Sequence, residues 1–222
     1  MHIKDNIIKH YLKNVYFING TAYAGKSSVC KALADRHDMV LCGENYAHTK
    51  FLSMSSPKTH PNMHYFTTMA DWEAFVSRSK EEYDAWLRDA ARELVEFEIT
   101  ELIARAGSGK KVIVDTNLPH DVLTRIASPH HVIYMVATPE IAATSFFDRP
   151  DREKQFLYGV LEGMDDPEAA IAHYREVIRY VNRHEIADAY RKTEYPVIER
   201  LSIDEPLEEK IHTAEQYFHL DE

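Results

Sequence analysis

The residues of this chain with the clearest chemical potential lie between Gly20 and Ser27. This stretch, GTAYAGKS, fits the pattern Gly-x-x-x-x-Gly-Lys-Ser/Thr, in which a glycine-bounded loop surrounds phosphate groups. Glycines at both ends let the backbone bend so that successive N–H groups point inward at phosphate oxygens. We expect Lys26 to reach the β- and γ-phosphates of a nucleotide and the Ser27 hydroxyl to bind Mg²⁺. The expected nucleotide contacts are Gly20, Thr21, Ala22, Tyr23, Ala24, Gly25, Lys26, Ser27 and Ser28.

The segments on either side of this loop are the ones that the motif requires. Residues 15–19 (VYFIN) form a short β-branched and aromatic run, which is typical of a buried parallel strand. Residues 28–37 carry apolar side chains at helical spacing, so we expect a helix whose positive end faces the phosphates. A strand, a loop and a helix in this order give the context in which the motif is meaningful.

Two carboxylates follow further predicted strands. Residues 112–117 (VIVDTN) are expected to form a buried strand, and Asp115 near its end is placed to hold Mg²⁺ directly or through water. Residues 39–42 predict another strand, after which comes Glu44. Because the carboxyl ends of parallel strands face the ligand crevice, we expect both side chains to lie near the phosphate loop.

The remaining pattern alternates helices with strands. Residues 46–70 show no periodicity and predict a long irregular loop, which could close over a second substrate. The other expected helices span residues 1–13, 72–76, 81–106, 121–126, 139–147, 167–192 and 206–218, and the other expected strands span 131–137 and 196–201. We therefore predict an α/β fold, a doubly wound parallel sheet of five strands.

Composition narrows the class of protein. The chain has 222 residues, 45% of them hydrophobic, and a formal net charge of −10. This acidity argues against a primary nucleic-acid binder. The two cysteines, Cys30 and Cys42, and the lack of a signal peptide or an apolar span predict a cytoplasmic protein without a membrane segment.

On these residues the chain resembles the P-loop small-molecule kinases, a superfamily that includes nucleoside monophosphate, shikimate and gluconate kinases and chloramphenicol phosphotransferase. The resemblance implies the P-loop NTPase fold, ATP and Mg²⁺ as cofactors, and one domain over residues 1–222. Its parts would be a core (14–44, 110–148 and 193–222), a helical substrate-binding insertion (about 45–109) and a lid (about 149–166).

The resemblance also implies roles for individual residues. A carboxylate would orient or deprotonate the acceptor hydroxyl, and Glu44 is the first choice for this base, with Asp115 as the second. Arg149 and Arg152 resemble lid arginines that neutralise the transferring phosphate, although the same charged run is also typical of a solvated loop. Residues 202–206 occupy the position where similar kinases surround the adenine.

The acceptor stays open at this stage. The insertion has few basic residues, which favours a small hydroxyl compound over a nucleotide, and Tyr46, Phe51, Tyr65 and Phe66 could stack on a ring. Two alternatives remain: a nucleotide-sensing protein that transfers no phosphate to a small molecule, and a kinase of an activated sugar that resembles the zeta toxins. We expect a nucleotide and a small-molecule acceptor as partners, and no nucleic acid or membrane; the oligomeric state stays open.

Overall fold

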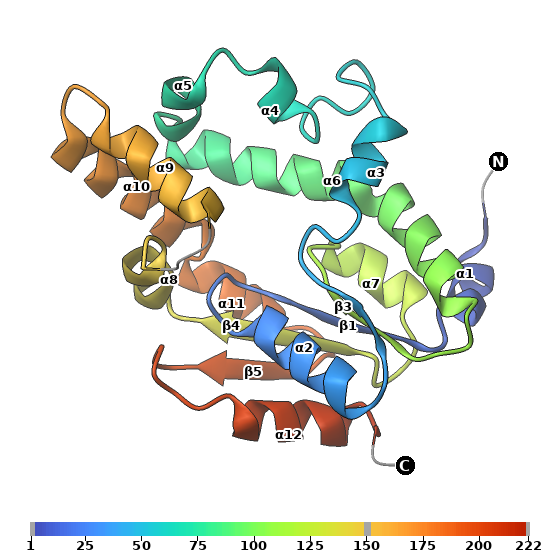
Figure 1. The fold of residues 1–222 in the computed structure, drawn as a ribbon. Coiled ribbons are helices and arrows are strands. Elements are labelled where there is room, and N and C mark those ends of the chain that lie inside the picture. The colour runs from blue at the N-terminus through green and yellow to red at the C-terminus, as the bar shows by residue number, and fades with distance from the viewer. Residues whose placement is uncertain (1–2, 149–151, 221–222) are drawn as a thin grey trace.

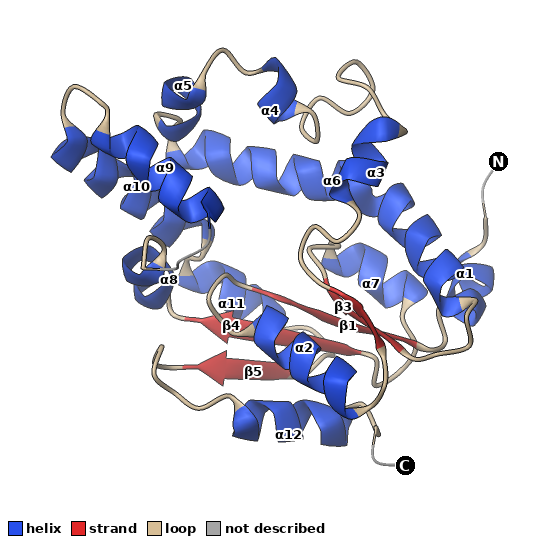
Figure 2. Cartoon of the chain, viewed as in Figure 1, coloured by secondary structure: helices blue, strands red, loops and turns tan. Residues whose placement is uncertain are grey.

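The computed structural model describes residues 3–148 and 152–220 of the chain. Five strands form one sheet in the order β2-β3-β1-β4-β5, and every neighbouring pair is parallel (Figures 1 and 2). The strands are β1 (Val15–Gly20), β2 (Val40–Cys42), β3 (Val112–Asp115), β4 (Val132–Ala137) and β5 (Val197–Arg200). This arrangement confirms the predicted doubly wound α/β fold.

Both faces of the sheet are covered because side chains alternate along each strand. On β1, Tyr16 and Ile18 pack against α2 (Lys26–Arg36) and α12 (Glu208–Tyr217). Val15 and Phe17 point the other way, into a core shared with α6 (Lys80–Ala106), α7 (His120–Ile126) and Tyr190 of α11 (His184–Arg191). The short helix α1 (Asp5–Tyr11) lies beside α7, where Arg125 pairs with Asp5 at 2.8 Å.

The helices between β2 and β3, called the insertion below, lie above the sheet, and those that follow β4 lie beside its left-hand end (Figure 1). The insertion contains α3 (His48–Ser53), α4 (Tyr65–Thr68), α5 (Trp72–Val76) and α6. The long helix α6 begins with a capping box, in which Ser79 and Glu82 bond each other's backbone amides. Helices α8 (Pro139–Ser145), α9 (Arg152–Glu162) and α10 (Pro167–Val181) follow β4.

Two predictions about these helices were wrong. Residues 46–70 are not wholly irregular, because α3 and α4 form there and Phe51 packs into a small core with Met63. The expected single helix over 167–192 is two helices, with a break at Asn182 and Arg183. Within the described residues, no helix combines the length and the apolarity needed to cross a lipid bilayer.

Candidate functional site

The phosphate loop connects β1 to α2 at the carboxyl edge of the sheet. Gly20 has φ of +135° and Gly25 has φ of +92°, values that side chains rarely tolerate. A Cβ atom on Gly20 would lie 1.8 Å from the carbonyl oxygen of Met135, and one on Gly25 would lie 2.9 Å from a methyl carbon of Leu207. The two glycines of the motif are therefore required both by backbone conformation and by packing.

Three residues that the sequence assigned to phosphate and metal chemistry lie at this loop. The Ser27 hydroxyl donates a hydrogen bond of 2.6 Å to Oδ2 of Asp115, although the two residues are 88 positions apart. Asp115 is 7% exposed at the end of β3. The Lys26 ammonium donates to the carbonyl of Thr21 at 3.0 Å, so it folds back over the loop.

This arrangement fits Mg²⁺ and a nucleotide phosphate. Hydroxyl and carboxylate oxygens are hard ligands that suit Mg²⁺, which keeps several water or phosphate ligands beside the few that a protein supplies. Ser27 and Asp115 would hold the ion. Within residues 3–148 and 152–220 no group of three or more His, Cys, Asp or Glu could hold a metal by itself. The first turn of α2, which includes Ser28, provides backbone N–H groups that have no partner within the helix.

The outer side of the loop is held by side chains that the sequence reasoning missed. The Thr21 hydroxyl accepts a 2.8 Å hydrogen bond from the backbone N–H of Ala137, which ties the loop to the end of β4. The amide of Asn182 accepts one of 2.7 Å from the N–H of Ala22. The Tyr23 hydroxyl donates to the carbonyl of Phe146 at 3.0 Å. These bonds anchor three successive loop residues to three places: the end of β4, the residue that follows α10 and the residue that follows α8.

Arg200, at the end of β5, joins the loop to the segment that follows that strand. Arg200 is 9% exposed, and its guanidinium donates to three backbone carbonyls, those of Tyr23, Ser202 and Ile203. Arg200 thus links the start of the segment 202–206, expected beside the adenine, to the phosphate loop. The sequence signal was only a basic residue at the end of a strand.

A chain of hydrogen bonds leads from the insertion to the first glycine of the loop. Thr116 donates to Oε1 of Glu98 at 2.6 Å and accepts from the N–H of Leu118 at 3.0 Å. The Leu118 carbonyl accepts from the amide of Asn19 at 2.7 Å, and that amide's oxygen accepts from the N–H of Gly20 at 2.6 Å. Glu98 belongs to α6, so the helix of the insertion is connected to the loop through buried polar groups.

Glu98 has an unusual environment for a carboxyl group. Its side chain is buried, and burial raises its pKa to about 7, with a further increase from the negative charge of Asp115 and a decrease from the Thr116 hydrogen bond. The hydroxyl of Tyr46 is also buried and has no hydrogen-bond partner within the described part of the chain. Burial, with a contribution from Glu98, raises the pKa of Tyr46.

The other predicted site residues lie at the surface or outside the described residues. Glu44 lies in the turn that follows β2 and is exposed. Arg152 is exposed at the first residue of α9, and Arg149 lies outside the described residues. The structure therefore brings together Lys26, Ser27 and Asp115, and it leaves Glu44 and Arg152 at the surface.

Aromatic side chains fill the insertion. Tyr65 packs near Phe75 and Trp86, with ring centroids 5.9 and 5.8 Å apart, and Arg78 lies over the Tyr65 ring at 4.3 Å. Trp72 of α5 meets Phe156 of α9 edge to face, with ring centroids 4.9 Å apart, so α5 contacts α9. Of the four rings expected to stack on an acceptor, Phe66 is 43% exposed, Tyr65 and Tyr46 are partly buried, and Phe51 is buried.

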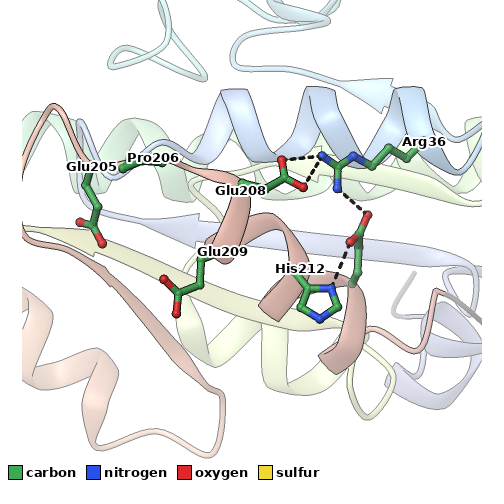
Figure 3. Close-up of a pocket in the computed structure, with 7 residues that line it drawn as sticks. Arg36, Glu205, Pro206, Glu208, Glu209 and His212 are labelled. Carbon is green, nitrogen blue, oxygen red and sulfur yellow. Dashed lines mark hydrogen bonds and ion pairs between the residues drawn. The ribbon is translucent and has the colours of Figure 1, made fainter.

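A surface groove of about 540 Å³ lies elsewhere, between α2 and α12 (Figure 3). It is lined by Glu205, Glu208, Glu209 and Glu215, with Arg36 and His212. Arg36 bonds Glu208 at 2.7 Å and Glu215 at 3.3 Å, so the guanidinium is already engaged by carboxylates. An acidic lining repels phosphate, so this groove is a poor site for a nucleotide.

The likeness of this chain to known proteins is one of fold. The sequence matches no family model and no curated protein. Among solved structures, a shikimate kinase from Bacteroides thetaiotaomicron is similar in fold, with 13% sequence identity and a TM-score of 0.48 over 91% of this chain and 94% of that chain. The order of the parallel strands, together with the glycine-bounded loop between β1 and α2, is the fold expected from the resemblance to P-loop small-molecule kinases.

Proposed function

We propose that this protein is a Mg²⁺-dependent phosphotransferase that moves the γ-phosphate of ATP to the hydroxyl of a small acceptor. The observation that carries the proposal is the 2.6 Å hydrogen bond between Ser27 and Asp115 at the mouth of the phosphate loop. A hydroxyl from the loop and a carboxylate from the neighbouring strand are the protein ligands used for Mg²⁺ in phosphoryl transfer on this type of loop.

Each residue has a role in the proposal. Mg²⁺, when bound, neutralises charge on the β- and γ-phosphates. Lys26 would leave the Thr21 carbonyl and bind the phosphates, since its long side chain starts from the first turn of α2. Glu44, exposed at the same edge of the sheet, would accept the proton of the acceptor hydroxyl, and Asp115 is the alternative base. Arg149 and Arg152 would approach the transferring phosphate from the lid.

The test is ADP production from Mg-ATP in the presence of a panel of nucleosides, nucleotides, sugars, shikimate-like acids and aminoglycosides. A rate that rises with one acceptor class supports the proposal and identifies the substrate. Tight ATP binding with a flat response across the panel would instead favour a nucleotide sensor or an acceptor outside the panel, such as an activated sugar.

Two variants assign the roles. Lys26→Ala is expected to lower the transfer rate at least a hundredfold, because the developing phosphate charge loses its cation. Near-normal turnover in this variant would refute the assignment of the loop. Glu44→Gln is expected to lower kcat much more than it changes ATP affinity. An unchanged kcat would move the role of the base to Asp115.

A further inference from the structure

The junction between α10 and α11 has a structure that the sequence did not predict. Helix α10 ends at Val181, Asn182 has φ of −111° and ψ of 19°, and Arg183 is extended with ψ of 156° before α11 begins at His184. The chain therefore changes direction at two polar residues in the middle of a stretch with helical periodicity. Their side chains show why the break is stable.

Both ends of the Asn182 side-chain amide are occupied. Its oxygen accepts from the N–H of Ala22 at 2.7 Å, and its nitrogen donates to the carbonyl of Ile178 at 2.8 Å. Asn182 is 4% exposed. The Ile178 bond fixes which end of the amide faces the phosphate loop, so the contact to Ala22 is held in one orientation. Asn182 and Ala22 are 160 positions apart in the sequence.

The neighbouring residue connects the same junction to the insertion. Arg183 forms an ion pair of 3.3 Å with Asp84 of α6, and it donates to the Tyr180 carbonyl at 2.9 Å. Asp84 is 7% exposed and also lies 3.5 Å from Arg88. Because Asn182 and Arg183 are adjacent, one backbone segment contacts both the phosphate loop and the long helix of the insertion.

We propose that Asn182 is a positioning residue for the phosphate loop, and that the Arg183–Asp84 ion pair couples the position of α6 to that loop. The inference rests on the proposed function, since it assumes that the loop binds a nucleotide. Asn182 holds the Ala22 amide in place before a ligand arrives. The loop then loses less conformational freedom on binding, and affinity increases.

The first measurement is Mg-ATP affinity by titration calorimetry. Asn182→Ala is expected to weaken binding about tenfold, the equivalent of one well-formed hydrogen bond. The matched control is Asn14→Ala, because the Asn14 side chain also bonds two backbone groups, the carbonyls of Ala106 and Lys110, but lies before β1 at the opposite end of the strand. The control is expected to lower stability and to leave Mg-ATP affinity within twofold of the unmodified protein.

The second measurement is hydrogen–deuterium exchange of residues 20–25 in the nucleotide-free protein, which does not depend on the proposed function. Asn182→Ala should speed exchange in this segment, and Asn14→Ala should not. Asp84→Asn should also speed exchange at residues 20–25. The double variant Asp84→Asn with Asn182→Ala should exchange no faster than Asn182→Ala alone, since the ion pair acts through Asn182.

The outcomes distinguish failure of the proposed function from failure of the positioning role of Asn182. If the unmodified protein fails to bind Mg-ATP while exchange at residues 20–25 rises in Asn182→Ala, the proposed function is refuted and the positioning role stands. If the protein binds Mg-ATP and Asn182→Ala changes neither affinity nor exchange, the positioning role is refuted. Should Asn182→Ala not fold, Asn182→Leu decides, because it keeps the size of the side chain and removes the acceptor of the Ala22 N–H; unchanged exchange at residues 20–25 there overturns the inference.

Discussion

Replacing Glu98 with glutamine should change the pH dependence of stability in a defined direction. Glu98 is 8% exposed, and its pKa is raised from an ordinary 4.5 to about 7, chiefly by burial. Glutamine has nearly the same shape, and its oxygen can accept the Thr116 hydrogen bond that Glu98 accepts at 2.6 Å. The variant therefore mimics the neutral carboxyl group and removes only its ionisation.

The sign follows from where the proton is held more tightly. Between about pH 4.5 and 7 the folded protein retains a proton on Glu98 that the unfolded chain releases, so this group's contribution to the free energy of unfolding falls as pH rises. The difference between 7 and 4.5 is about 2.5 pH units, which at 1.36 kcal/mol each corresponds to a cost of about 3 kcal/mol at pH 8. Glu98→Gln avoids that cost.

The assay is urea unfolding of both proteins at pH 5, 6, 7 and 8, without Mg²⁺ or nucleotide. The stability of Glu98→Gln minus that of the unmodified protein should grow with pH to about 3 kcal/mol. Glu101→Gln, one turn along α6, is the control, and its stability difference from the unmodified protein should stay constant from pH 5 to 8, because Glu101 titrates below this range. The hydrogen bond from Lys50 is the first cause of the lowered pKa of Glu101, so its contribution to stability is present at neutral pH and is lost as pH falls through that pKa. A difference that stays flat from pH 5 to 8 for Glu98→Gln would show that Glu98 is not buried as a neutral acid.

Three further outcomes follow from the site. Gly20→Ala should destabilise the protein by about 3 kcal/mol, because its Cβ would meet the Met135 carbonyl; Gly43→Ala, whose Cβ would meet nothing within 4 Å, should not, and chemical denaturation compares them. Asp115→Asn should raise the Mg²⁺ concentration needed for half-maximal activity at least tenfold, measured by magnesium titration at fixed ATP. Arg200→Lys should cost about 2 kcal/mol of stability, since an ammonium cannot span three carbonyls, and an unchanged melting temperature would count against that role.

The core of the fold could be predicted because its signals are local. The phosphate loop is one continuous motif, and β1 and β3 are apolar runs that are buried on both faces. The approach of Ser27 to Asp115 followed from the rule that parallel strands end at one edge. The helical insertion was harder. Residues 46–70 lack periodicity, and α3 and α4 span only six and four residues, so tertiary packing and not intrinsic propensity sustains them.

The residues that hold the loop from outside could not be predicted by the same reasoning. Asn182 bonds a residue 160 positions away, and Arg200 bonds Tyr23 across 177 positions. One weak local signal was present, since asparagine is a poor helix former that is favoured at helix ends. The apolar periodicity of residues 171–181 nevertheless led to the prediction of one continuous helix. That periodicity carries no information on where the helix ends, or on the bond between the Asn182 side chain and the phosphate loop.

These buried polar groups have one property in common that links the fold to the proposed chemistry. Asn182 and Arg200 are less than a tenth exposed, and each would destabilise the folded state if its polar atoms had no partners. Both find partners in the backbone of the phosphate loop, and Thr116 with Glu98 reaches it through Leu118 and Asn19. A loop that moved away would leave several of these groups buried and unpaired at the same time. The hydrogen bonds of these groups therefore also hold the loop in one conformation. A loop that is already ordered can bind phosphate without a large loss of conformational entropy.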